Sequence, residues 1–260
     1  MIFDKPSPEK QLQDRLIPGV LFVVAQAARN KSTVSFAQID DAVVSAMVPA
    51  DAQERGKMRR SLFDILAKKV LIRQGLASFS KARTEGGPQI MNITQRGMAL
   101  LGRRCADMLP VPDLKQDLSV STEAPRVTEK DLVIPALATL VKMHEETGLP
   151  VNMTDLREGI KRMLTISSKD LDPLDGRTDF KIDQVIRNLR SHNTLLKNGW
   201  VLNTDEGYVP SERGYAQLAE EYLALLPSPD FSKKLDAPVE PAADAQDISA
   251  TVVRPRMRHR

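Results

Sequence analysis

The stretch Thr94-Gln95-Arg96-Gly97 returns 117 residues later as Ser211-Glu212-Arg213-Gly214, and each copy caps an apolar helical run. Ile17-Pro18 and Ile134-Pro135 open two earlier apolar runs, and they stand the same 117 residues apart. A repeat of this length indicates a duplicated domain, because the repeats of solenoid proteins are about 20–50 residues long. We therefore predict two copies of one small helical unit that includes a hairpin.

Bulk composition is typical of a helix-rich protein of two domains, each of about 100 residues. The chain has 260 residues and few aromatic side chains: 7 Phe, 3 Tyr and 1 Trp. Its longest apolar stretch, residues 20–28, is interrupted by Gln26 and is much shorter than the ~20 residues of a membrane span. The single cysteine excludes an internal disulfide, and the N-terminus lacks the pattern of a signal peptide. We expect a cytoplasmic protein with no membrane association.

Apolar spacing and turn residues predict the same order of elements in both copies: helix, short extended link, helix, turn, helix, two-stranded hairpin, helix. In the first copy the expected helices are 16–29, 36–47, 51–70 and 94–108, and the expected strands are 76–80 and 89–93. In the second copy the expected helices are 131–146, 154–164, 180–197 and 211–225, and the expected strands are 200–202 and 208–209. This order is that of the winged helix-turn-helix, whose third helix can lie in the major groove of DNA.

The predicted fold is therefore mainly α with small β-hairpin wings, arranged as two tandem winged helix-turn-helix domains. We place domain 1 at residues 16–108 and domain 2 at residues 131–225, with a flexible linker at 109–130 that holds several prolines. Residues 1–15 are expected to form an N-terminal arm or a lead-in helix. Residues 226–260 are rich in Pro, Ala, Asp and Ser, and arginines stand at every second position from 254 to 260. We therefore expect a disordered tail with a basic end.

Positive charge is concentrated in the first copy. Residues 1–110 carry 17 Lys and Arg against 10 Asp and Glu, whereas residues 131–225 carry 11 against 15. This asymmetry favours contact between the first copy and a polyanion. Several basic contacts to phosphates can release enough counterions for salt-sensitive binding without any reading of bases.

The candidate DNA-binding residues lie on the two third helices and on the first wing. A recognition helix must bury an apolar stripe and turn basic side chains outward. In the first copy the candidates are Arg55, Lys57, Arg59, Arg60, Lys68, Lys69, Lys81 and Arg83. In the second copy they are Lys181, Arg187, Arg190, His192, Asn193 and Lys197. The alternative for Arg190 and His192 is that they brace the helix end, and Asn193 is expected on the core side of its helix.

The run 186–200, followed by the hairpin at Tyr208 and the Ser211-Glu212-Arg213-Gly214 cap, resembles the N-terminal winged-helix region of Mrr-type restriction endonucleases. The resemblance covers about residues 134–218, and residues 17–101 more weakly. It implies a DNA-binding module, of a style that also occurs apart from any nuclease. A second winged helix stands here in place of the nuclease domain of that family.

No catalytic, metal or cofactor motif is found in the sequence. Asp172, Asp175 and Asp179 lack the strand pattern that a nuclease Asp…Glu-x-Lys arrangement requires. Three scattered histidines and one cysteine give no metal-ligand spacing. There is no Gly-rich phosphate loop, nucleophile elbow or paired-carboxylate motif. We expect no enzymatic activity and no cofactor.

The sequence thus favours a nucleoid-associated, double-stranded DNA-binding protein that acts in transcription regulation, genome organisation or replication. The alternative is a protein-interaction subunit of a chromosome-condensing or restriction-type complex, since tandem winged helices in condensing complexes bind protein partners. The acidic balance of the second copy supports this alternative, and the basic third helix of the first copy opposes it. We also consider a homodimer, or a protein partner bound through domain 2.

Overall fold

The computed structural model describes residues 7–30, 34–47, 49–67, 70–80, 90–110, 112–114 and 117–226. Within them the protein is mainly helical, with short strands in two-stranded sheets. The start of the expected arm, almost all of the expected tail and the tip of the first hairpin lie outside the described residues.

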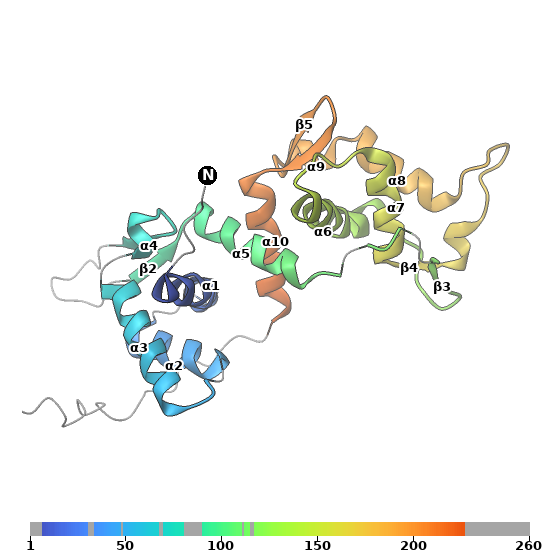
Figure 1. Ribbon diagram of the computed structural model, residues 1–260. Helices are drawn as coiled ribbons and strands as arrows, with labels where there is room; N and C mark the ends of the chain where they lie inside the picture. The colour runs from blue at the N-terminus through green and yellow to red at the C-terminus, as the bar shows by residue number, and fades with distance from the viewer. Residues whose placement is uncertain are drawn as a thin grey trace, which may run out of the picture.

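The two halves of the chain repeat one order of elements (Figure 1). The first half contains α1 (Pro8–Arg29), α2 (Phe36–Met47), α3 (Ala52–Ala67), α4 (Val70–Arg73), β1 (Ala77–Ser80), β2 (Ile90–Ile93) and α5 (Gln95–Met108). Strand β3 (Ser119–Ser121) follows. The second half contains α6 (Glu129–Thr147), α7 (Met153–Met163), β4 (Thr165–Ser167), the 3-10 helix η1 (Ser168–Leu171), α8 (Lys181–Ser191), α9 (Thr194–Lys197), β5 (Val201–Thr204), β6 (Gly207–Pro210) and α10 (Glu212–Leu225).

Helix α1 begins earlier than the sequence predicts. Its N-cap is Ser7, whose hydroxyl accepts a hydrogen bond from the Lys10 backbone N–H at 3.3 Å. Pro8 stands at the first helical position, where its missing N–H costs nothing. Of the two alternatives for this segment, residues 8–15 adopt the lead-in helix, which is continuous with the first helix.

The turn that leads into each hairpin is built identically in the two halves. Gly75 and Gly199 both adopt a left-handed φ of 69°, which favours glycine because it has no Cβ. The Thr94 hydroxyl donates to the Gly75 carbonyl, and the Ser211 hydroxyl donates to the Gly199 carbonyl, both at 2.6 Å. Each hydroxyl also accepts from the backbone N–H three residues later, at 3.1 Å. The sequence prediction that Thr94 and Ser211 cap these helices is confirmed.

A glycine then allows each cap to approach the hairpin closely. A Cβ atom on Gly97 would overlap the Leu76 carbonyl oxygen, and one on Gly214 would overlap the Trp200 carbonyl oxygen. Since 97 and 214 are 117 residues apart, the two copies share the same close contact. This explains why the cap stretch includes a glycine in both places.

The hairpins are paired in equivalent register. Strands β1 and β2 align Ala77 with Ile93, and β5 and β6 align Val201 with Pro210. In the second half Val151 adds a short bridge to the hairpin, with two backbone hydrogen bonds to Tyr208 at 2.8 and 2.9 Å. The expected extended link at Val151 is therefore confirmed.

The sequence predicts one continuous third helix in the second half. In the structure this helix is broken into two. Helix α8 ends at Ser191, and Asn193 adopts a left-handed conformation with φ of 54° before α9 begins. The side chain of Asn193 is exposed, so its expected position on the core side is wrong. Asparagine tolerates this conformation better than most residues, which accounts for the break at this position.

Part of the expected flexible linker at 109–130 is ordered. Strand β3 runs parallel to β4, aligning Val120 with Ile166, so the segment is attached to the second half. The buried Asp170 of η1 accepts a hydrogen bond from the Val127 backbone N–H at 2.8 Å and lies 3.5 Å from the Arg126 Nε atom. The linker prediction is wrong for these residues because the segment pairs with a distant strand, which local composition does not reveal.

The last helix of each half contributes side chains to both cores. Ala219 and Leu223 of α10 are buried in the core of the first half, and Ala99 and Ala106 of α5 are buried in the core of the second. Figure 1 shows α5 and α10 crossing between the halves, where they pack directly on each other. The buried Gln26 of α1 also donates to the Leu223 carbonyl at 3.3 Å. Each half therefore completes its core with a helix from the other.

Candidate nucleic-acid interface

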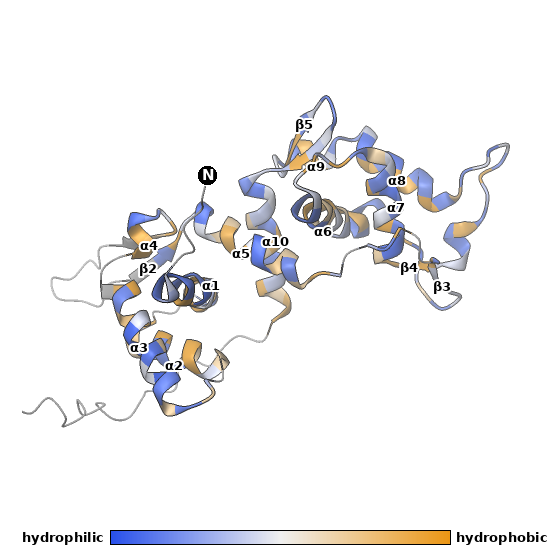
Figure 2. Ribbon diagram, viewed as in Figure 1, coloured by the Kyte–Doolittle hydropathy of each residue, from blue (hydrophilic) through white to orange (hydrophobic). Residues whose placement is uncertain are grey.

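Helix α3 buries one side and exposes the other. Met58, Leu62 and Ile65 are at most 1% exposed and pack in the core of the first half. Hydrophilic and hydrophobic residues alternate along its ribbon, as expected for a helix with a single buried side (Figure 2). Asp51 fixes its start, since the carboxylate accepts from the Glu54 backbone N–H at 2.7 Å.

Three of the predicted basic residues on α3 are exposed and have no carboxylate partner among the described residues: Arg55, Lys57 and Arg60. Lys57 and Arg60 are three residues apart and so lie side by side on the helix surface, while Arg55 stands apart from both. The helix therefore presents a pair of neighbouring cations and a third, separate one to solvent.

Arg59 is exposed as well, but it forms an ion pair with Asp40 of α2 at 3.2 Å. Burial raises the pKa of Asp40, and the nearby Arg59 only partly offsets this effect. Half of the Arg59 side chain remains accessible, so the pair holds α3 on α2 and leaves part of the guanidinium group open. The other predicted basic residues of the first half, Lys68, Lys69, Lys81 and Arg83, lie outside the described residues.

Sequence reasoning missed two further residues on the exposed side of α3. Phe63 is 67% exposed, although its neighbour Leu62 is fully buried. Gly56 has nothing within 4 Å of the position a Cβ atom would occupy. Gly56, Arg60 and Phe63 are spaced by four and three residues, so they lie along one stripe of the helix. The signal was present, since Phe63 falls outside the apolar spacing of Met58, Leu62 and Ile65.

In the second half, three of the six predicted DNA contacts are paired with acidic side chains. The Lys181 Nζ atom lies 2.7 Å from the Asp172 carboxylate, and Arg187 is hydrogen-bonded to Asp179. The His192 Nδ1 atom lies 2.8 Å from the Glu129 carboxylate. The hydrogen bond from Lys181 also holds the pKa of Asp172 below its usual range. This geometry favours the bracing alternative for His192.

Arg190, Asn193 and Lys197 remain exposed in the second half. No carboxylate in the described part of the chain pairs with Arg190 or Lys197. Two cations on α8 and α9 are therefore open to solvent, against three on α3. The structure thus leaves a weaker basic surface on the second half.

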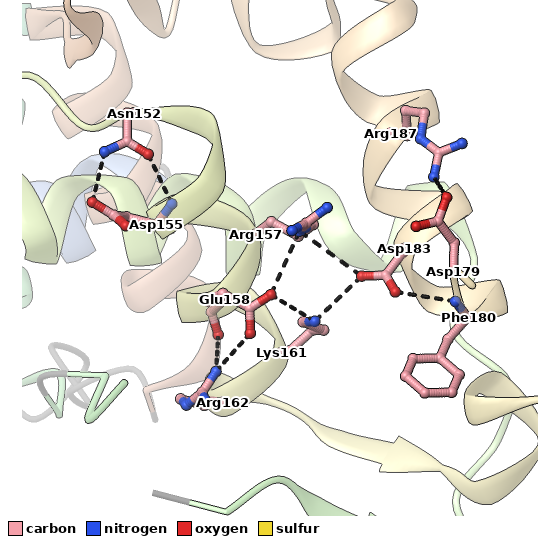
Figure 3. A network of polar contacts seen from close by, with 10 residues as sticks. All are labelled: Asn152, Asp155, Arg157, Glu158, Lys161, Arg162, Asp179, Phe180, Asp183 and Arg187. Carbon is pink, nitrogen blue, oxygen red and sulfur yellow. Dashed lines mark hydrogen bonds and ion pairs between the residues drawn. The ribbon is translucent and has the colours of Figure 1, made fainter. Parts of the chain in front are cut away.

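A polar network joins α7 to the start of α8 (Figure 3). The Lys161 Nζ atom lies 2.7 Å from the Glu158 carboxylate and 3.3 Å from the Asp183 carboxylate, and both Lys161 and Asp183 are buried. Asp183 also accepts from the Phe180 backbone N–H at 3.1 Å, which caps α8. Burial alone would raise the pKa of Glu158, but hydrogen bonds from Lys161 and Arg162 outweigh burial and lower the pKa. The network fixes α8 against α7, and its cations are paired with carboxylates.

The surroundings of Trp200 and Cys105 indicate structural roles for both residues. Trp200 packs against the core of the second half, as its position at the start of the hairpin predicts. Burial raises the pKa of the Cys105 thiol to about 11, so the thiolate is scarce near neutral pH.

In the described ranges no group of three His, Cys, Asp or Glu residues could hold a metal ion. None of the helices described is both long enough and apolar enough to cross a membrane.

Comparison with protein-family models, with curated proteins and with solved structures found no match to this chain.

Proposed function

We propose that this chain is a non-enzymatic protein that binds double-stranded DNA through α3, and that each half is a winged helix-turn-helix. The order of elements supports the fold: a set of helices, a two-stranded hairpin and a closing helix follow one another in both halves. In such a domain the third helix enters the major groove and the hairpin lies along the phosphates. The resemblance of the second half to the N-terminal region of Mrr-type endonucleases agrees with this proposal.

The observation that carries the proposal is the set of cations on α3 that are exposed and have no carboxylate partner among the described residues. These are Arg55, Lys57 and Arg60, whereas the core-facing side chains of the same helix are buried. Unpaired basic side chains on one exposed helix can neutralise phosphates, and the counterions that this releases make the binding favourable and salt-dependent. Phe63 would supply an apolar contact, of the kind that side chains make with the methyl group of thymine.

The second half would contribute less to DNA affinity. Its ion pairs occupy Lys181, Arg187 and His192, and of the candidate cations there Arg190 and Lys197 are left for phosphates. Regulation of transcription, genome organisation and replication are the roles open to such a binder.

A protein partner on the second half is the second candidate, and exposed apolar side chains favour it. Leu149 is 64% exposed, Leu202 is 58% exposed and Phe180 is 40% exposed. Exposed apolar side chains of this size are typical of the centre of protein interfaces when they gather in one patch. This alternative corresponds to a subunit of a chromosome-condensing or restriction-type complex.

The test measures duplex binding by the full chain at about 50 mM salt. The fluorescence anisotropy of a labelled duplex reports the binding. The variants Lys57→Ala and Arg60→Ala should each weaken binding for all duplex sequences alike, because a phosphate contact carries no sequence information. Arg177→Ala removes an exposed arginine from the second half and serves as the control. Absence of binding by the unaltered chain would favour the protein-partner alternative.

A further inference from the structure

A hollow lined by arginines lies where the two halves meet. Its volume is about 430 Å³, and Arg73 at the end of α4, Arg96 and Arg103 on α5, and Glu212 at the start of α10 line it. Arg96 and Arg103 are seven residues apart, so they lie on the same side of α5 with Ala99 and Leu100 between them. We name this hollow the arginine groove.

The positive charges of the arginine groove are not neutralised within the chain as described. Arg73, Arg96 and Arg103 form no ion pair with any described carboxylate, and Glu212 is the only acidic residue among the lining residues. Arginines that do not stabilise the fold through ion pairs keep their full capacity to bind an external anion. Three guanidinium groups around one hollow therefore leave an excess of positive charge in it.

One of these arginines is held in place by packing. The Arg103 guanidinium carbon lies 4.8 Å from the centroid of the Tyr215 ring, a cation–π contact across the two halves. Tyr215 is itself 3% exposed and donates a hydrogen bond to Glu145 of α6. A guanidinium group that is already ordered loses less entropy when it binds a ligand.

The duplication supplies a second hollow for comparison. The offset of 117 residues carries Arg96, Ala99, Leu100 and Arg103 onto Arg213, Ala216, Gln217 and Glu220, and these four residues line a hollow of about 820 Å³. The two hollows therefore share one equivalent wall, formed by α5 in one and by α10 in the other. Arg103 corresponds to Glu220, so a cation in one hollow is replaced by a carboxylate in the other. The excess of positive charge is a property of the arginine groove and does not follow from the repeated architecture.

We propose that the arginine groove is a binding site for a phosphate group. The planar guanidinium fork matches the oxygens of a phosphate in a bidentate arrangement, and charge-assisted hydrogen bonds of this kind are among the strongest in proteins. The phosphate is carried either by a small phosphorylated ligand or by the backbone of a duplex. The proposal does not depend on DNA binding by α3, because no residue of α3 lines the groove.

The experiment titrates the full chain with pyrophosphate and follows thermal unfolding and calorimetric heat, with sodium chloride at matched ionic strength as the reference. We expect pyrophosphate to raise the melting temperature in a saturable way that sodium chloride does not reproduce. Arg73→Gln and Arg103→Gln should each weaken pyrophosphate binding by about tenfold or more, the loss expected for one charge-assisted hydrogen bond. Arg29→Gln, which lies in the other hollow, should bind as the unaltered chain does.

Two arms distinguish the source of the phosphate. If the duplex backbone supplies it, Arg73→Gln lowers duplex affinity and pyrophosphate competes with the duplex. If a small ligand supplies it, Arg73→Gln loses pyrophosphate binding and keeps its duplex affinity. Lys57→Ala should leave pyrophosphate binding unchanged in both cases, so a failure of the α3 proposal is seen separately.

The proposal is overturned if pyrophosphate stabilises the chain no more than sodium chloride does. It is also overturned if both Arg73→Gln and Arg103→Gln bind pyrophosphate as the unaltered chain does. Arg103→Gln removes the packing on Tyr215, so circular dichroism must show that the variant folds. Arg73→Gln has no such contact and decides the matter if Arg103→Gln unfolds.

Discussion

The backbone carbonyl oxygen of Tyr215 occupies the place where a Cβ atom on Gly102 would stand. Gly102 lies on α5 and Tyr215 on α10, so the two helices touch backbone to backbone at this point. No side chain at position 102 fits without moving the helices apart. The joint between the two halves therefore depends on one glycine.

Replacing this glycine should loosen the joint. We expect Gly102→Ala to lower the free energy of unfolding by about 1–3 kcal/mol, as overpacking of a tight contact does. Urea denaturation followed by circular dichroism measures the change. The matched control is Gly56→Ala, which lies in the middle of α3 with open space around it.

Gly56→Ala should have the opposite effect. Alanine in place of an exposed helical glycine stabilises a helix by about 0.5–1 kcal/mol. The same denaturation experiment should therefore show a higher midpoint for this variant. A Gly102→Ala protein as stable as the unaltered chain, or a destabilised Gly56→Ala protein, would contradict the described packing.

The shared packing of α5 and α10 in both cores predicts one cooperative unfolding transition for the two halves. Because Ala219 and Leu223 are buried in the first core and Ala106 in the second, neither core survives the loss of the other intact. Calorimetric and van't Hoff enthalpies should agree. Two well-separated transitions would show that the halves fold independently, as the two-domain boundaries from the sequence imply.

Acid should weaken the contact between α7 and α8. The pKa of Glu158 is lower in the folded protein than in the unfolded chain. As the pH falls, Glu158 is therefore protonated in the unfolded chain before it is protonated in the folded protein. The stability that Glu158 contributes is therefore full above its ordinary pKa of 4.5 and is lost as the pH falls through the lower value in the folded protein. Glu158→Gln should flatten the dependence of stability on pH in this acid range.

The measurement is the urea midpoint between about pH 5 and pH 3, in the window where a carboxylate with a depressed pKa titrates. Glu206→Gln, in the exposed turn of the second hairpin, should keep the slope of the unaltered chain. Equal slopes for the unaltered chain and for Glu158→Gln would show that the network of Figure 3 contributes nothing to acid stability.

Ion pairing predicts that substitutions of basic residues in the two halves change duplex affinity by unequal amounts. Lys181→Ala and Arg187→Ala remove cations that Asp172 and Asp179 already neutralise, so duplex affinity should change little. Lys57→Ala removes an unpaired cation and should weaken binding more. Anisotropy titrations of the three variants at one salt concentration make the comparison. A larger loss for Lys181→Ala than for Lys57→Ala would assign the main contact to the second half.

Local sequence features predicted much of the fold. The caps at Thr94 and Ser211 and the order of the elements both follow from short-range patterns. The extended link at Val151 was also predicted from its position between two helices.

Features that depend on distant segments were not predicted. The parallel pairing of β3 with β4 joins residues more than forty positions apart, and each strand alone is only three residues long. The crossing of α5 and α10 depends on Gly102, which the sequence presents as an ordinary helical glycine. The ion pairs that occupy Lys181 and Arg187 arise from a loop whose path the sequence does not fix. For the same reason the arginine groove, which gathers residues from three helices, was not anticipated.

The most direct measurement for the central proposal is the salt dependence of duplex binding. The combined variant Arg55→Gln, Lys57→Gln and Arg60→Gln removes from the full chain the three cations of α3 that have no carboxylate partner in the described ranges. Each lost phosphate contact lowers the slope of log K against log salt by about 0.9, so we predict a slope shallower by nearly three for the combined variant. An unchanged slope, with the variant still folded, would contradict DNA binding through α3.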